Sequence, residues 1–302
     1  MSPYLQETAC YLGQNLPFDE GSEMLLKLTG CEISDKQIER ISHFYGQSLE
    51  EAASQDADNQ AFSAKTDLHY ALVDGSMVFT REDGWREMKL GRVFAASSLV
   101  AYKDRREVAK SLYTAHLGNH TDFFEKFDRH LDGLKNLVVL ADGAPWIWDF
   151  FDTTYPDAVQ ILDVFHALER LSQFALVQFK EKDERTQWIA VQKEKLLENG
   201  IDTIIQTIKE LVCKGQALEI QQKTITYLNN NKHRMLYKTY KDKGYLIGSG
   251  PIESAHRHVI QQRLKLAGQR WTLKGIQQVA NLRVAYKNRQ EHNILKIIKK
   301  AA

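Results

Sequence analysis

The order of strand-like and helix-like segments is the feature that most constrains how this chain folds. Residues 69–80 alternate apolar and polar side chains and are rich in β-branched and aromatic residues, which predicts a strand. After an Asp83-Gly84 turn, residues 85–102 predict one or two further strands that form a hairpin with the first. A helix is expected over residues 120–134. This part of the chain therefore predicts antiparallel strands followed by a helix.

Two short apolar runs follow this helix. Residues 137–141 (LVVLA) predict a buried central strand, and residues 158–162 predict a second buried strand. A helix rich in aromatic residues is expected between them, after Pro145. The resulting element order is three antiparallel strands, then a helix, a strand, a helix and a strand. This is the order of the ribonuclease H-like fold, an α/β architecture with a mixed sheet. We therefore expect that fold class.

Helical patterns dominate the rest of the chain. They extend from residue 165 to about residue 240, so we expect an all-helical insertion over about residues 170–245, before the last helix of the ribonuclease H-like domain. The Gly248–Pro251 turn ends it, and a final helical block follows. We expect one ribonuclease H-like catalytic domain over residues 66–302, preceded by a polar linker at residues 53–66.

Residues 1–60 predict a small separate helical region. Ser34 and Gln37 have the spacing of a capping box at a helix start, and the helix expected over residues 19–28 ends at a turn at Gly30. Helix, short turn, helix is the outline of a helix-turn-helix. The region holds three basic and eleven acidic residues, which argues against strong DNA binding. A recognition helix and a helix that packs or contacts a partner both stay open.

Charge is unevenly distributed along the chain. From Lys232 to the end there are sixteen Lys and Arg against three Asp and Glu, whereas the preceding residues hold twenty-four and thirty-six. A basic C-terminal quarter on an acidic body favours a polyanionic partner for that end. The alternative is a set of solvated helix faces.

The composition is that of a soluble globular protein, with 43% hydrophobic and 26% charged residues. There is no apolar run of about 18 residues that would span a membrane, and the N-terminus lacks the pattern of a secretory signal. The cysteines, Cys10, Cys31 and Cys213, are widely spaced without a Cys-x-x-Cys pair, which excludes a zinc ribbon within the chain. We expect reduced thiols and a cytoplasmic location.

Three acidic residues form the candidate site. Asp74 and Asp142 each follow an apolar run and precede a glycine, so each is expected at or near a strand end. If the strands are neighbours, the carboxylates share one edge and repel each other, a cost that a divalent cation such as Mg²⁺ reverses. Glu253 falls in the first turn of the helix that Pro251 is expected to begin. Taken alone, Glu253 could cap that helix; taken together, the three acids predict a metal site.

Four motifs carry a resemblance to a known family: VDGS, ADGAPWIWD, LDVFH and GSGPIESAHRHVIQQRLKLAGQRW. They resemble the DDE transposases of bacterial insertion sequences, and most closely the Kra family, which is related to the mutator-like group. The resemblance covers essentially the whole chain. It implies that Asp74, Asp142 and Glu253 are the catalytic residues and hold two Mg²⁺ or Mn²⁺ ions. The activity it implies is cleavage of insertion-sequence ends and their joining to target DNA.

The resemblance also assigns supporting residues. Asp163 and His166 match an Asp-x-x-His element of the family. One interpretation is that this element handles the DNA end or supports the metal site, and the other is that it caps the start of a helix. His256 is a further supporting residue, and Trp85 is expected to pack in the interior. Phosphate contacts, or alternatively a solvated face, are expected from Arg257, Arg263 and Arg270. Lys265 and Trp271 complete the expected DNA-binding residues.

The partners implied are double-stranded DNA, both element ends and target, and further copies of the chain when it is bound to DNA in the bacterial nucleoid. Members of the family begin further upstream, so we expect an N-terminally shortened copy whose recognition of specific ends is open. Two alternatives remain. One is a ribonuclease H-like nuclease that cuts without joining, and the other is a DNA-binding remnant without catalysis.

Overall fold

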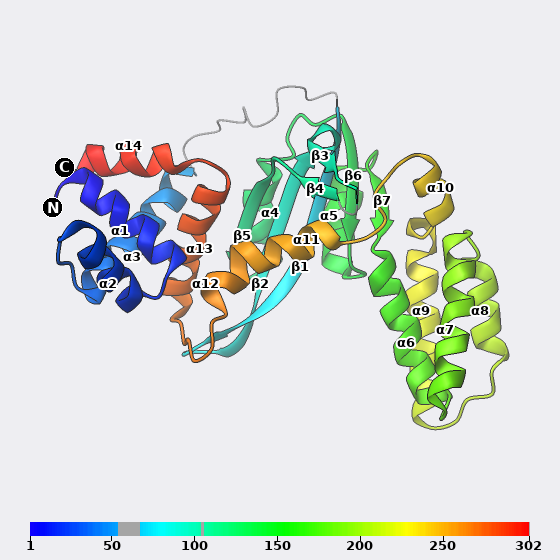
Figure 1. Ribbon diagram of the computed structural model, residues 1–302. Helices are drawn as coiled ribbons and strands as arrows, with labels where there is room; N and C mark the ends of the chain where they lie inside the picture. Colours follow the sequence, from blue (N-terminus) through cyan, green and yellow to red (C-terminus); the bar gives the residue numbers. More distant parts are fainter. Residues whose placement is uncertain (54–66, 104–105, 302) are drawn as a thin grey trace. The chain divides into compact units, whose positions relative to one another are not determined.

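The computed structural model describes residues 1–53, 67–103 and 106–301 (Figure 1). The expected linker lies almost wholly outside these residues. The chain divides into two compact units, each described by itself below. The first unit comprises residues 1–69, 74–135 and 251–302, and the second comprises residues 70–73 and 136–250.

The first unit begins with the helices α1 (Pro3–Asn15), α2 (Phe18–Thr29) and α3 (Asp35–Ala53). The expected helix at residues 19–28 is confirmed as α2, which ends at Gly30 in the left-handed conformation with φ 71°. A side chain at Gly30 would be strained there, which is why glycine ends this helix.

The capping box at the start of α3 is present as expected. Oγ of Ser34 accepts a hydrogen bond from the backbone N–H of Gln37 at 3.3 Å, and Oε1 of Gln37 accepts one from the N–H of Ser34 at 3.2 Å. Each side chain therefore satisfies a backbone donor that the first helical turn leaves without a partner.

The N-terminal helices pack against the C-terminal helices α13 (Leu273–Lys287) and α14 (Glu291–Ala301). Helix α3 contacts α13, and α1 contacts α14. They share a hydrophobic core whose buried members are Cys10, Tyr45, Leu282, Ala285, Ile294 and Ile298. Residues from opposite ends of the chain thus form one helical cluster within the first unit.

A five-stranded sheet has the order β5-β2-β1-β6-β7. Strands β2 and β5 pair antiparallel and β6 and β7 pair parallel, so the sheet is mixed and the protein is of the α/β class. The strands expected at residues 69–80, 137–141 and 158–162 are confirmed. The bounds are β1 Leu68–Thr80, β2 Gly84–Ala95, β5 Leu112–Leu117, β6 Asn136–Ala141 and β7 Val159–Leu162.

The third antiparallel strand is not where the sequence pattern placed it. β2 ends at Ala95, and the next strand, β3 (Leu99–Ala101), pairs with β4 (Arg106–Val108) in a separate two-stranded sheet. The partner of β2 in the main sheet is β5, in a register from Met88 opposite Leu117 to Val93 opposite Leu112. All residues of β5 but the last are buried, so the strand lacks the polar and apolar alternation that would have indicated it.

The helices expected over about residues 170–245 are present in the second unit, after β7. On α8, Ile201, Ile204, Ile205 and Ile208 are buried at the spacing of one helix face, which explains its amphipathic sequence. The expected helix at residues 120–134 is shorter and corresponds to α4 (His120–Asp128) in the first unit. No helix among the residues described is long and apolar enough to cross a membrane. The helices of the second unit are α5 Pro145–Thr154, α6 Val164–Gln178, α7 Lys182–Leu197, α8 Ile201–Glu210, α9 Gln216–Asn231 and α10 Tyr237–Asp242.

Candidate functional site

Asp74 lies in the middle of β1, not at or near its end as the sequence pattern suggested, because the strand continues through Gly75 to Thr80. Oδ1 of Asp74 accepts a hydrogen bond from the backbone N–H of Gly75 at 2.7 Å, which orients the carboxylate. Gly75 also leaves room for the carboxylate of Glu87, which would have to shift if this position carried a Cβ. The side chain of Asp74 is 23% exposed, so it remains accessible to a ligand.

Glu253 lies in the first turn of α11 (Gly250–Ala255), as expected. The start of this helix is held by Arg92, whose guanidinium donates a hydrogen bond to the carbonyl of Pro251. Arg92 is itself buried, with its charge over the rings of Phe94 and Tyr113. Glu253 is exposed on the helix surface.

His256 begins a π-helical segment, His256–Gln261, that continues α11 and leads into α12 (Gln262–Leu264). The histidine is 3% exposed, and its Nε2 lies 3.3 Å from Oδ2 of Asp74. Neither ring nitrogen meets the geometry of a hydrogen bond with another described residue. The structure therefore brings together two of the expected residues, Asp74 and the supporting His256, in close contact. Short π-helical segments are frequent at functional sites.

The residues expected to bind DNA fall into two groups. Arg257, Lys265 and Arg270 are exposed, and Nζ of Lys265 donates a hydrogen bond to Oγ of Ser76 on β1 at 3.2 Å. Their cationic groups therefore lie on the surface of the first unit.

Arg263 and Trp271 lie in the interior instead. Arg263 is 1% exposed, and its guanidinium carbon lies 4.9 Å from the ring centre of Phe18 and 4.8 Å from that of Trp271. Its Nε donates to the carbonyl of Gly13 at 2.9 Å. Burial lowers the pKa of Arg263 to about 10. Because neither side chain reaches the surface, we revise their expected DNA contact to a structural role, joining the α1–α2 region to the end of the long motif.

Asp163 and His166 form the clearest polar network in the second unit. Asp163 is fully buried and caps α6, accepting from the backbone N–H groups of Phe165 and His166. It also accepts from the N–H of Ser249 at 3.0 Å and from its hydroxyl at 2.9 Å. Nδ1 of His166 lies 2.7 Å from Oδ2 of the same carboxylate. The capped helix start is thus present, and Asp163 also ties the Gly248–Gly250 turn to α6.

Asp142 follows β6 directly, and its Oδ1 accepts a hydrogen bond from the N–H of Ala144 at 2.9 Å. Asp142 and His166 line the same pocket of about 320 Å³, together with Glu169 and Arg170. Because Asp163 engages Nδ1 of His166, the other ring nitrogen is the one through which this histidine can act.

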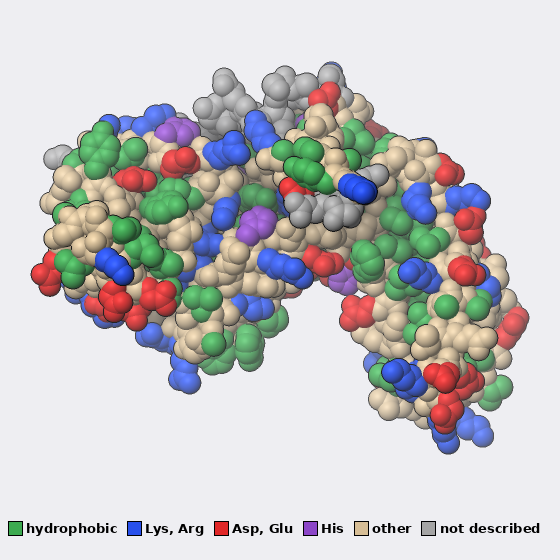
Figure 2. Space-filling view, viewed as in Figure 1, with side chains coloured by type: hydrophobic (Ala, Val, Ile, Leu, Met, Phe, Trp, Pro, Cys, Tyr) green, Lys and Arg blue, Asp and Glu red, His purple; other side chains and the backbone are tan. Residues whose placement is uncertain are grey.

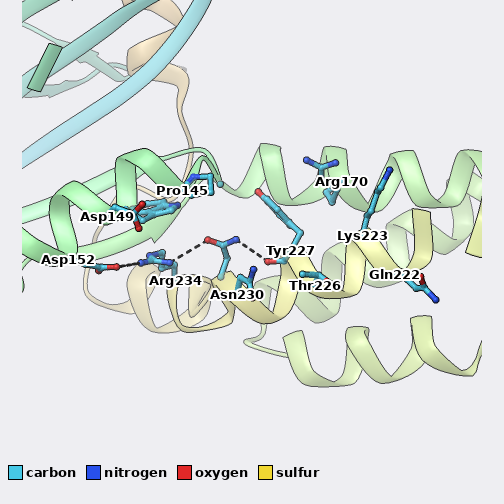
Figure 3. Close-up of a pocket in the computed structure, with 13 residues that line it drawn as sticks. Pro145, Asp149, Asp152, Arg170, Gln222, Lys223, Thr226, Tyr227, Asn230 and Arg234 are labelled. Carbon is cyan, nitrogen blue, oxygen red and sulfur yellow. Dashed lines mark hydrogen bonds and ion pairs between the residues drawn. The ribbon is translucent and has the colours of Figure 1, made fainter. Parts of the chain in front are cut away.

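A larger pocket of about 650 Å³ adjoins it between α5, α6 and α9 (Figure 3). The two pockets share the lining residues Gly143, Pro145, Arg170 and Tyr227. The guanidinium carbon of Arg170 lies 4.8 Å from the ring centre of Tyr227, and Arg234 pairs with Asp152 at 3.1 Å. The sequence analysis missed this pocket. Its signal is a run of polar side chains on one face of α9: Gln222, Lys223, Thr226, Tyr227 and Asn230.

A model of a protein family matches residues 23–301 and bears the description "Uncharacterised protein family (UPF0236)". The chain belongs to this family. The matched range contains all of the expected site residues of this UPF0236 protein. No curated protein matches the chain at a significant level.

The three candidate acids of this UPF0236 protein are divided between the units. Asp74 and Glu253 belong to the first unit, and Asp142 belongs to the second. Within residues 1–53, 67–103 and 106–301, no group of three His, Cys, Asp or Glu side chains is assembled to hold a metal ion. The carboxylates of Asp74 and Asp142 are nevertheless each oriented by a backbone N–H, and carboxylate oxygens are the ligands that Mg²⁺ prefers.

Proposed function

We propose that this UPF0236 protein is a DNA transposase with a ribonuclease H-like core, which cleaves the ends of a mobile element and joins them to target DNA. The observation that carries the proposal is the position of two aspartates in the mixed sheet. Asp74 is in β1, Asp142 directly follows β6, and β1 and β6 are neighbours in the strand order. Antiparallel strands followed by strands that alternate with helices support the fold, and the four sequence motifs support the activity.

The proposed catalytic residues are Asp74, Asp142 and Glu253. When bound by these carboxylates, two Mg²⁺ or Mn²⁺ ions would activate a water or a 3′-hydroxyl and stabilise the leaving oxygen of the phosphodiester. The backbone N–H of Gly75 and that of Ala144 each fix one oxygen of an aspartate, which limits the reorientation needed to bind a cation. The surface cations of the first unit hold the phosphates on either side.

Glu253 is the ligand that we propose to engage last. It is exposed in the first turn of α11, just after the Gly248–Gly250 turn. DNA bound beside Arg257, one turn further along, would bring phosphate charge next to this helix. We propose that DNA and metal together complete the site with Glu253.

The test uses the purified chain and duplex DNA that ends in inverted repeats, which are first to be identified by sequencing the DNA on either side of the gene. The wild type is expected to nick these ends in Mg²⁺ and to yield strand-transfer products with a target plasmid. Asp74→Asn, Asp142→Asn and Glu253→Gln should each lose cleavage while still binding the DNA. Asp183→Asn, an exposed acid at the start of α7, and Glu291→Gln, an exposed acid at the start of α14, are the matched controls that should retain it.

The two alternative functions give different products in the same assay. A nuclease would release nicked DNA without strand transfer, and a non-catalytic remnant would bind the ends and cleave nothing in either metal. Cleavage by all three acidic variants at the wild-type rate would refute the proposed site.

A further inference from the structure

Two features of the first unit lie outside the proposed site. One is apolar: Trp85, which was expected to pack in the interior, is 63% exposed on β2, so that expectation is wrong. The other is a group of basic side chains that come together from β2, the π-helical segment after α11 and the helix α13. We call this group the basic cluster, and its members are Arg92, His258, Arg283 and Lys287.

Tyr113 on β5 positions three members of the basic cluster. It lies directly opposite Arg92 in the sheet, and the guanidinium carbon of Arg92 is 5.4 Å from its ring centre. Its hydroxyl oxygen is 3.3 Å from Nε2 of His258. Its backbone N–H donates to the side chain of Asn288 at 2.8 Å, and its carbonyl accepts from the same side chain at 3.0 Å. These two bonds fix the end of α13, and with it Lys287.

Two members of the basic cluster are buried cations. Arg283 is 1% exposed, and all three of its guanidinium nitrogens donate to backbone carbonyls of the π-helical segment and of α1. Arg92 is 4% exposed and donates to the hydroxyl of Ser111 and the carbonyl of Pro251. These acceptors are neutral, so they satisfy N–H groups without neutralising either positive charge.

Every charged side chain that shifts the pKa of His258 or Lys287 is positive. Burial, followed by the charges of Arg92 and Lys287, lowers the pKa of His258 to about 4. Burial, followed by the charge of Arg283, also lowers the pKa of Lys287. Within the described part of the chain, no acidic side chain forms an ion pair with a member of the basic cluster. The cluster therefore carries positive charge that neighbouring acids do not neutralise.

Positive charge that is partly removed from water is costly unless an opposite charge accompanies it. Glu291, the first acid after Lys287 in the chain, acts instead on Tyr286, whose pKa it helps to raise. A bound anion would supply the missing negative charge and reverse the repulsion among the members of the basic cluster.

The basic cluster is open to solvent at two of its members. His258 and Lys287 are half-buried, and among the residues that the structure describes the ammonium group of Lys287 donates no hydrogen bond. Its N–H donors are thus available to a ligand. In Figure 2, Lys and Arg side chains gather on the first unit around the end of α13, with a histidine side chain beside them.

We propose that the basic cluster binds a phosphate group of the DNA backbone, with Lys287 contacting the phosphate oxygens and the two buried arginines adding positive potential. A carboxylate is matched best by the paired N–H groups of an accessible arginine, whereas lysine binds phosphate as a point charge. Here the arginines are buried and the accessible cation is the lysine, which favours phosphate. The phosphate chemistry rests on the cluster alone; its assignment to DNA rests on the proposed function.

The first test measures binding of inorganic phosphate to the full chain in EDTA, by equilibrium dialysis at constant ionic strength. Lys287→Met keeps the length of the side chain and removes its charge. It should weaken phosphate binding by roughly 10- to 100-fold, the loss expected for one hydrogen bond between charged groups. Lys287→Arg should retain most of the binding. Lys296→Met, which removes an exposed lysine of α14, is the matched control and should bind phosphate as the wild type does.

Stability separates a ligand contact from a structural role. In chloride, Lys287→Met should unfold at the same temperature as the wild type or higher, because it removes a charge without a negative partner. Phosphate should raise the unfolding midpoint of the wild type more than that of the variant, since a ligand stabilises the state that binds it. The NMR signals of the His258 ring should shift when phosphate is added to the wild type, and those of the exposed His292 should not.

The second test identifies the source of the phosphate with duplex DNA in EDTA. Lys287→Met should reduce the slope of log affinity against log salt by about one, the value for one phosphate contact. An unchanged slope, with inorganic phosphate binding lost in the same variant, would assign the site to a free phosphate ion and overturn its role in DNA binding.

Equal phosphate binding by Lys287→Met and the wild type would overturn the site itself. So would a lower unfolding midpoint for Lys287→Met in chloride, because the lysine would then have a structural role. Failure of the wild type to cleave DNA, with the difference in salt slope retained, would refute the proposed transposase and support the phosphate contact.

Discussion

Nδ1 of His166 lies 2.7 Å from Oδ2 of Asp163, one turn apart at the start of α6. The carboxylate is fully buried inside the second unit, while the histidine side chain is 36% exposed. The histidine lines the same pocket as Asp142. The same carboxylate binds Ser249 in the turn that precedes α11. One buried acid thus sets both the orientation of His166 and the path of the chain 86 residues later.

Replacing this acid should lower stability. Asp163→Asn replaces one acceptor oxygen by an amide NH₂ donor. This donor would face Ser249 and His166, both of which donate to the carboxylate in the wild type. We expect the free energy of unfolding to fall by about 1.5–3 kcal/mol, the range for hydrogen bonds to a charged group, as measured by urea denaturation. Asp183→Asn, at the exposed start of α7, should change it by no more than about 0.5 kcal/mol. Equal stabilities of the two variants would contradict the assigned role.

Two arginines of the same motif should behave in opposite ways. Arg263→Leu removes a buried cation that donates to Gly13 and packs between two rings, so we expect a clear fall in the thermal unfolding midpoint. Arg270→Ala, at an exposed position, should leave stability within about 0.5 kcal/mol. It should instead weaken DNA binding and reduce the slope of log affinity against log salt by about one. An Arg270→Ala variant with unchanged salt dependence would exclude a phosphate contact there.

Stability should decrease in mild acid partly through His116 on β5. Burial, followed by the nearby charge of Lys126, lowers the pKa of His116 to about 4. The unfolded chain binds a proton at this histidine near the ordinary pKa of about 6.5, whereas the folded chain binds it only near pH 4. Protonation therefore favours the unfolded state, so the free energy of unfolding is unaffected well above pH 6.5 and falls as the pH drops from about 6.5 toward 4. His116→Gln should flatten the dependence of the unfolding midpoint on pH in this range. A control with His292→Gln, an exposed residue of α14, should not flatten it.

Glu253 should affect metal-dependent cleavage more than DNA binding. Glu253→Gln keeps the size of the side chain but weakens it as a metal ligand, so the variant should bind element ends nearly as well as the wild type and fail to nick them. Titration of Mg²⁺ and Mn²⁺ with each protein, with and without DNA, measures both effects. His256 would not substitute for it in Mg²⁺, because imidazole is a poor ligand for that ion. Nicking by Glu253→Gln at near the wild-type rate would remove Glu253 from the proposed site.

Local chemistry explains which elements could be predicted from sequence. The period-two pattern of residues 69–80, the capping box at Ser34 and the Asp163 cap of α6 depend on residues a few positions apart, and each is present in the structure. The third antiparallel strand was misplaced because β5 is buried along nearly its whole length and so carries no alternation. The position of Asp74 within β1 was also missed, since a glycine does not by itself end a strand.

The sequence by itself determined the α/β class, the helical character of residues 165–240 and the acidic residues that could hold a metal. Only the tertiary structure decided which aromatic and cationic side chains meet solvent. Arg263 and Trp85 look alike in sequence as motif residues, yet the first is buried and the second exposed. The physical reason is that exposure depends on distant partners: the carbonyl that accepts from Arg263 belongs to Gly13, 250 residues earlier. Among the described residues, no segment packs over the ring of Trp85 closely enough to shield it from water.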